Sequence, residues 1–106
     1  MPKYLYSAKY NTEGMKGVWK DGGSKRREAA DQAIKSVGGK MESFYFAFGD
    51  HDVVGIAELP DTASAVALST TINASGETMI KLTPLITPEE VDQASRKMPQ
   101  YRPPGK

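Results

Sequence analysis

The sequence predicts a single α+β domain built on an antiparallel sheet. Two observations indicate this fold: segments with the period-two alternation of strands are interspersed with segments of helical spacing, and glycine, proline or aspartate marks most boundaries. The chain has 106 residues, of which 39% are hydrophobic and 25% charged, as is typical of a globular protein with one core. We expect a domain over residues 1–97 and a flexible, proline-rich tail over residues 98–106.

The chain begins with one predicted strand and one weak helical segment. Residues 3–10 alternate between two faces and place three tyrosines on one of them. Thr12 can cap a helical segment that reaches Trp19, with apolar side chains spaced three and four residues apart. Gly14 and Gly17 disfavour a helix, so we expect a turn or two at most.

In the middle of the chain the sequence pattern predicts a longer helix and two strands. Ser24 can cap a helix over residues 25–37, which the glycine pair Gly38-Gly39 ends. Residues 41–48 alternate as a second strand, with three phenylalanines on one face. Residues 53–59 form a third strand that is apolar on both faces apart from one glutamate.

The last part of the chain repeats the helix–strand pattern. Asp61 or Thr62 can cap a helix that ends at a serine–glycine pair. Residues 78–86 read as a fourth strand, and Pro84 predicts that this strand lies at a sheet edge. Thr87 then caps a short terminal helix, with proline at its first position.

The resulting order is strand, helix, strand, strand, helix, strand. This is the ferredoxin-like βαββαβ arrangement, a split βαβ pattern. Right-handed crossovers place the first and third strands in the centre, with both helices on one face of the sheet. A sheet covered on one side should be polar on its open side. Here the second and third strands are apolar on both faces, which predicts a homodimer, or a higher homo-oligomer, with two sheets packed face to face.

Composition excludes several classes of function. The net charge is +1, which gives no electrostatic basis for binding nucleic acid. The chain has no cysteine, so it has neither disulfides nor zinc–thiolate sites. No apolar run has the length of a membrane span, and the N-terminus lacks the apolar core of a signal peptide. We therefore expect a cytoplasmic protein with no membrane partner.

Four segments span nearly the whole chain: TEGMKGV, SKRREAADQAIKSVGGK, FYFAFGDHDVVGIAELPD and LTPLITPEEV. The hairpin in the third of them reads Gly49-Asp50-His51-Asp52. In these segments the chain resembles the GYD domain family, small proteins with a dimeric α/β-barrel, ferredoxin-like fold. The name-giving motif of that family is a glycine, a residue that is often acidic, an aromatic residue and an aspartate in a hairpin; here histidine stands where tyrosine is usual. The resemblance implies the fold and the dimer but no particular reaction or cofactor.

The turn between the second and third strands holds the only histidine of the chain. In one interpretation glycine and aspartate simply shape the turn. In a second, His51 is a general base, because its ordinary pKa suits proton transfer near neutral pH. A metal site would need ligands from another segment, because consecutive turn residues do not converge on one ion. We therefore assign no metal ligands.

Topology brings further candidates to the same end of the domain. The first strand ends where the third begins, which predicts that Tyr10 lies near Asp52, together with the start of the helix at residues 25–37. Lys25 and Arg26 in the first turn of that helix could hold an anion, or could pair with nearby carboxylates. Neither a Walker sequence nor a G-x-S-x-G motif occurs, so P-loop and serine-hydrolase chemistry are not supported.

The aromatic side chains have two interpretations. Most such stripes form a core or an interface, whereas Tyr6 and Trp19 have polar groups that also suit the lining of a pocket. We assign His51 and Tyr6 as candidate catalytic residues. The candidate ligand-binding residues are Tyr10, Trp19, Lys25, Arg26 and Asp52.

Three functions remain open from the sequence. The first is a small-molecule-binding protein with a pocket between sheet and helices. The second is a cofactor-independent monooxygenase or isomerase of small aromatic or polyketide-like molecules, an analogy that rests on the fold alone. The third is a structural module whose main property is self-association.

Overall fold

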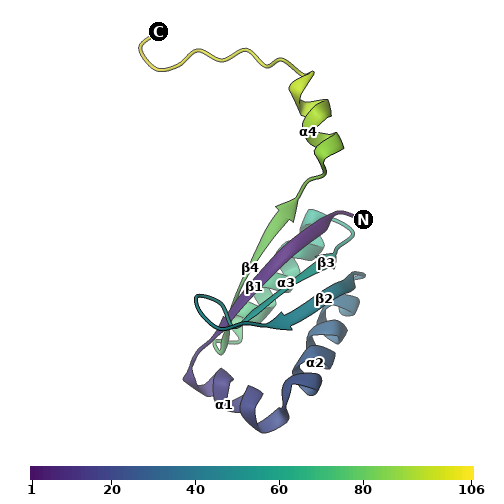
Figure 1. The fold of residues 1–106 in the computed structure, drawn as a ribbon, viewed down its shortest axis with the longest axis vertical. Helices are drawn as coiled ribbons and strands as arrows, with labels where there is room; N and C mark the ends of the chain where they lie inside the picture. The colour runs from purple at the N-terminus through teal and green to yellow at the C-terminus, as the bar shows by residue number, and fades with distance from the viewer.

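A computed structural model describes all residues, 1–106. It contains one four-stranded antiparallel sheet and four helices (Figure 1). The elements in chain order are β1 (Lys3–Tyr10), α1 (Thr12–Asp21), α2 (Gly23–Ser36), β2 (Lys40–Phe46), β3 (Val53–Glu58), α3 (Thr62–Ala74), β4 (Thr78–Leu85) and α4 (Pro88–Ser95). No helix has the length and hydrophobicity that a bilayer crossing requires.

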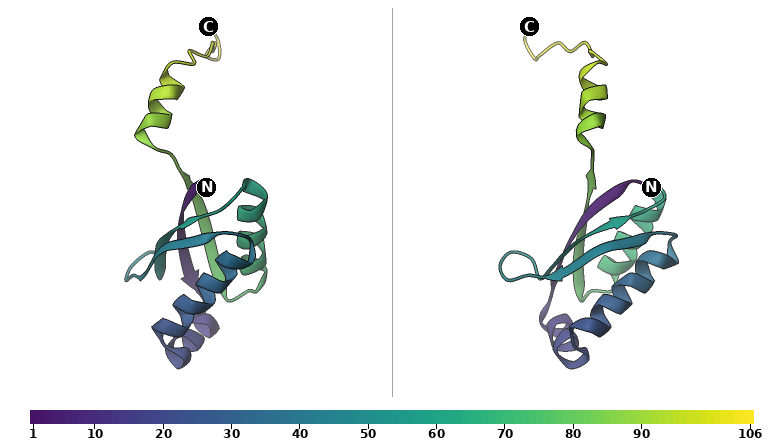
Figure 2. Two further views of the ribbon diagram at one scale, coloured as in Figure 1. Left: turned by 90° about the vertical axis from the view of Figure 1, so that its right-hand side faces the viewer. Right: turned by 45° about the vertical axis from the view of Figure 1, so that its right-hand side comes forward.

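The strand order in the sheet is β2-β3-β1-β4. The two central strands, β1 and β3, pair antiparallel, with Tyr6 opposite Gly55. Helices α2 and α3 lie on the same face of this sheet, α2 near β2 and α3 near β4 (Figure 2). β4 forms an edge of the sheet, which confirms the position predicted from Pro84.

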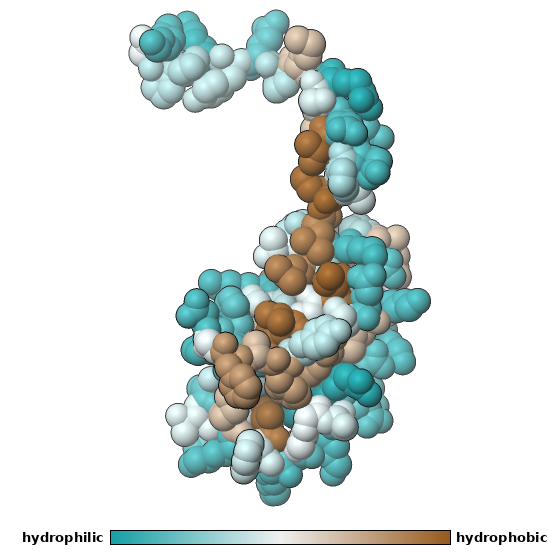
Figure 3. Space-filling model, viewed as in Figure 1, coloured by the Kyte–Doolittle hydropathy of each residue, from teal (hydrophilic) through white to brown (hydrophobic).

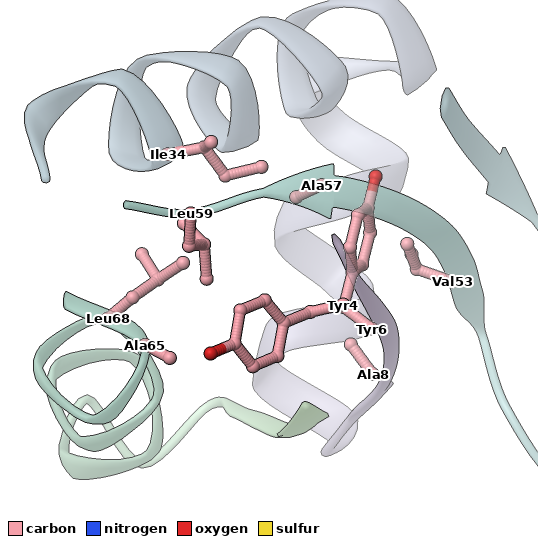
Figure 4. Close-up of a cluster of buried hydrophobic side chains, with 9 residues drawn as sticks. All are labelled: Tyr4, Tyr6, Ala8, Ile34, Val53, Ala57, Leu59, Ala65 and Leu68. Atoms are coloured by element: carbon pink, nitrogen blue, oxygen red, sulfur yellow. The ribbon is translucent and has the colours of Figure 1, made fainter. Parts of the chain in front are cut away.

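The core fills the space between the sheet and these two helices (Figure 4). Alternate residues of β1 and β3 point into it, and α2 and α3 contribute branched or small side chains from the other side. The tyrosine face predicted for β1 is therefore the buried face. The buried residues are Tyr4, Tyr6, Ala8, Ile34, Val53, Ala57, Leu59, Ala65 and Leu68.

Gly55 in β3 is required by the packing of Tyr6 against the strand. A Cβ atom at this position would overlap both the Tyr6 hydroxyl and the backbone carbonyl of Ser43. The same hydroxyl donates a hydrogen bond to that carbonyl. The glycine thus lets a tyrosine side chain cross a central strand and reach the backbone of β2.

The expectation of one or two turns for α1 was too short, because the helix runs over ten residues. Its cap is Asn11 rather than Thr12, since the Asn11 side chain accepts a hydrogen bond from the Gly14 N–H at 2.8 Å. Gly14 is buried where α1 passes the Glu77 carbonyl, which leaves no room for a Cβ atom. A tertiary contact therefore offsets the low helix propensity of this glycine.

Other element ends also differ from the prediction. α2 starts at Gly23 with Gly22 as its cap and no side-chain cap bond, so Ser24 lies inside the helix. β2 ends at Phe46, and Phe48 is fully exposed in the hairpin loop rather than on the strand face. The predicted caps at Asp61 and Thr87 are confirmed, the latter as a capping box with Glu90.

The C-terminal arm, residues 86–106, extends away from the domain and makes the molecule 57 Å long (Figure 1). Within this arm α4 is an eight-residue helix with no buried residue. The segment that follows it, 98–106, contains neither helix nor strand. The apolar side chains of the arm are therefore open to solvent.

Candidate functional site

The hairpin between β2 and β3 is held by its glycine and its last aspartate. Gly49 has φ 131°, a backbone conformation that side chains rarely adopt. The Ala47 N–H donates to the Asp52 carbonyl at 2.9 Å, and the Asp52 N–H donates to the Ala8 carbonyl at 2.8 Å. These backbone bonds close the loop and join it to β1, and the φ of Gly49 explains why glycine is favoured at that position.

The Asp52 carboxylate binds the end of β1. Its Oδ2 atom accepts a hydrogen bond from the Tyr10 N–H at 2.9 Å. Next to it the Asn11 N–H donates to the Glu77 carbonyl at 3.1 Å, which joins β1 to the loop before β4. The prediction that Tyr10 and Asp52 meet at one end of the sheet is therefore confirmed.

An open groove lies at this end of the domain, between α1 and the β2–β3 hairpin. It consists of two adjoining hollows of about 640 and 510 Å³, within the usual range for small-molecule sites. Four residues line both hollows: Tyr10, Met15, Trp19 and Asp52. We call this feature the α1 groove. The first hollow is further lined by Lys9, Asn11, Thr12, Lys16 and Lys20, and the second by Val18, Gly22, Gly23, Phe46, Ala47, Phe48 and Gly49.

The α1 groove gathers several large apolar side chains that are exposed to solvent. Trp19 is 89% exposed and Phe48 is fully exposed, while Met15 and Phe46 are about half covered. Single exposed apolar residues are common, but four around one hollow form a patch of the kind that marks a binding surface. The α1 groove lies beside the sheet rather than beneath α2 and α3, where the buried side chains pack. Two other hollows, of about 640 and 250 Å³, lie where α2 meets β2 and where α3 meets β4.

His51 lies outside the α1 groove although it is adjacent in sequence to Asp52. It lines a small hollow of about 180 Å³ on the other side of the hairpin. The other residues of that hollow are Ser7, Lys9, Asp50, Met79, Ile80 and Lys81. No group of three His, Cys, Asp or Glu side chains is placed to hold a metal ion.

Tyr6 also lies outside the α1 groove, in the core of the domain. Its side chain is only 4% exposed, and its hydroxyl donates to the Ser43 carbonyl. Burial raises the pKa of Tyr6 to about 12. The two candidate catalytic residues, Tyr6 and His51, are therefore placed in different environments, and the structure does not bring them together.

The candidate cations Lys25 and Arg26 are on α2 and line neither hollow of the α1 groove. The Nε atom of Arg26 is buried without a hydrogen-bond partner. The start of α2 does reach the groove, but through Gly22 and Gly23. The cations that line the groove are instead Lys9, Lys16 and Lys20.

Of the predicted ligand-binding residues, the structure brings together Tyr10, Trp19 and Asp52 and leaves out Lys25 and Arg26. Sequence reasoning missed Lys16, Lys20 and Phe48 as lining residues. The three-residue spacing of Lys16 and Trp19 would have indicated neighbouring positions on the helix surface if residues 12–21 had been predicted as a full helix. Chemically, the groove offers flat apolar walls and a basic rim, without a cluster of acid and base groups.

Comparison with known proteins gives one result. The sequence model of the GYD domain matches residues 4–95, which includes the sheet apart from Lys3 at the start of β1, the hairpin and α4. No curated protein and no solved structure matches the chain.

Proposed function

We propose that this chain, which belongs to the GYD domain family, binds a small molecule in the α1 groove. The observation that carries this proposal is the gathering of Met15, Trp19, Phe46 and Phe48 around one hollow. Covering these side chains with a flat ligand removes apolar surface from water, which is the main source of affinity in such sites.

A fragment screen by two-dimensional NMR tests this proposal. Trp19 is the only tryptophan, so its indole N–H gives a single signal that reports on the groove. Flat apolar fragments should shift this signal. Trp19→Ala lacks the indole, so its binding is read from the backbone N–H signals of Tyr10 and Asp52, which also line both hollows; the affinity should fall at least tenfold, about 1.4 kcal/mol. Tyr101→Ala is the matched control, because Tyr101 is exposed and belongs to the C-terminal segment, which lies at the opposite end of the molecule from α1 (Figure 1). Equal binding by both variants would refute the proposal.

We also propose that the domain is ferredoxin-like and pairs with a second copy through its open sheet face, as in a dimeric α/β barrel. Figure 3 shows apolar side chains gathered over this face and continuing along the end of β4 to the C-terminal arm. Antiparallel sheets that are open on one side are normally polar there. The apolar residues of this face are Leu5, Tyr45, Val54, Ile56, Met79 and Leu85.

The C-terminal arm supports a second copy as the partner of this face. An isolated eight-residue helix is marginal in water, so α4 needs a packing partner that its own domain does not supply. Val91 in α4 and Ile86 just before it form an apolar surface, and Glu89 and Asp92 make α4 acidic. On the open face Lys81 has no ion-pair partner, as is also true of Lys9. The charges of α4 and of the open face are therefore complementary.

Light scattering after size exclusion tests the dimer. We expect the mass of two chains, and the mass of one chain for Leu5→Lys, because this change places a charge in the apolar interface. Val66→Lys is the matched control, since Val66 is exposed on the outer side of α3. Removal of residues 86–106 should also weaken the dimer. A single-chain mass for the unmodified protein would refute this part of the proposal.

A further inference from the structure

The face of α1 that lines the groove carries two parallel rows of side chains. Met15 and Trp19 form an apolar row, and Lys16 and Lys20 form a cationic row beside it. Residues four apart lie above one another on a helix, so each row runs along the helix axis. A ligand that covers the apolar row therefore has its edge next to two ammonium groups.

The charges around this surface favour an anion. Three lysines (Lys9, Lys16 and Lys20) line the first hollow of the groove against a single carboxylate, that of Asp52. Asp52 already accepts a hydrogen bond from the Tyr10 N–H. Among the lysines only Lys16 has an ion pair, a solvent-exposed one with Glu13 at 3.5 Å, and such a pair is weak.

On the opposite wall the hairpin presents aromatic surface. Phe46 and Phe48 line the second hollow together with Trp19. The edge of the Phe46 ring lies 3.0 Å from the position that a Cβ atom on Gly23 would take, so the ring packs at the start of α2. Phe46 also packs edge to face on Phe44, with ring centroids 5.2 Å apart, which fixes its orientation.

From these observations we propose that the ligand of the α1 groove is a planar aromatic anion. Its ring covers Met15 and Trp19, which line both hollows, and reaches the hairpin phenylalanines on one side, while its carboxylate or phosphate lies at Lys16 and Lys20 on the other. This inference rests on the proposed function and adds the chemical class of the ligand. A neutral ligand of the same shape would leave the lysines in water and gain only the apolar contact, so the charge is what the site selects.

Three matched probes test the inference: 2-naphthoate, its neutral amide 2-naphthamide, and 2-naphthyl phosphate. Affinities come from the shift of the Trp19 indole signal and from calorimetry at low salt. We expect an anion to bind at least tenfold more tightly than the amide. This advantage should shrink in 0.5 M salt, because the Debye length falls to a few ångströms. The anion that binds more tightly shows whether the site prefers a carboxylate or a phosphate.

A pair of double variants separates the charge from the groove itself. Lys16→Gln/Lys20→Gln should remove most of the anion advantage and leave the affinity for the amide unchanged. Lys97→Gln/Lys106→Gln removes the same net charge in the C-terminal arm and should keep the advantage.

Each other outcome has a distinct meaning. Equal binding of amide and anions overturns the inference and leaves the proposed function standing. No response of the indole signal to any probe overturns both. An indole signal that follows protein dilution rather than ligand would assign the groove to a second copy and overturn the inference as well.

Discussion

Replacing Tyr6 by phenylalanine tests whether this residue stabilises the fold or acts at a site. The change removes only the hydroxyl oxygen, which donates a hydrogen bond to the Ser43 carbonyl from within the core. The ring that packs against Gly55 remains. The expected effect is therefore on stability and not on ligand affinity.

The size of this effect follows from the hydrogen bond. A typical intramolecular hydrogen bond contributes about 1 kcal/mol, and a buried carbonyl left without a donor costs about 1–3 kcal/mol. We expect Tyr6→Phe to lower the free energy of unfolding by about 2 kcal/mol. For a domain of this size the midpoint of thermal unfolding then falls by roughly 8–16 °C.

The same substitution has a pH signature. The pKa of Tyr6 is raised from 10.0 to about 12 in the folded protein. The folded state therefore holds the phenolic proton more tightly than the unfolded state. The stability that this more tightly held proton adds to the folded state is fully present below pH 10 and is lost as the pH rises toward 12. The stability difference between the unmodified protein and Tyr6→Phe should thus shrink over this interval.

Urea unfolding followed by circular dichroism measures both effects, at pH 7 and between pH 9 and pH 12. Tyr4→Phe is the matched control, because Tyr4 is equally in the core but its hydroxyl makes no hydrogen bond. The free energy of unfolding should fall much less in Tyr4→Phe than in Tyr6→Phe. Unchanged stability of Tyr6→Phe together with lost binding of the α1-groove ligand would refute the reasoning and restore Tyr6 as a site residue.

Three further substitutions test the fold and the placement of the hairpin. Gly55→Ala should cost about 3 kcal/mol or more in urea unfolding, because its Cβ atom meets a carbonyl and the Tyr6 hydroxyl; a loss below 1 kcal/mol would contradict this packing. Asn11→Ala should cost about 1–2 kcal/mol, since the side chain caps α1 and also donates to the Gly76 carbonyl at 2.8 Å; unchanged helix content and stability would count against it. His51→Ala should change stability by no more than about 0.5 kcal/mol and leave indole shifts on ligand addition unchanged; loss of binding would show that His51 reaches the groove.

The sequence was informative wherever one local signal decided the structure. Alternation identified β1 and placed its tyrosines on one face, and Pro84 predicted an edge position for β4. The caps at Asp61 and Thr87 use local hydrogen bonds between neighbours in the chain, which is why they could be recognised. The meeting of Tyr10 with Asp52 followed from topology, because the two strand ends had to lie together.

Features that depend on contacts distant in the sequence could not be predicted. The low helix propensity of Gly14 predicts a short α1, whereas in the structure this glycine allows the helix to pass the Glu77 carbonyl. The full length of α1 decides which of its side chains line the groove. A prediction of only one or two turns therefore does not identify Lys16 and Lys20 as lining residues. Because His51 and Asp52 are adjacent in the sequence, both are predicted to lie at one site. In the structure, however, the two residues line different hollows.

The central claim, that the α1 groove is the ligand site, is tested most directly by magnetisation transfer between a bound 2-naphthoate and the protein. Nuclear Overhauser effects from the naphthalene protons should reach the Met15 methyl group and the Trp19 ring. Effects on Leu5 and Ile56 of the open sheet face, with none on Met15 or Trp19, would contradict the claim.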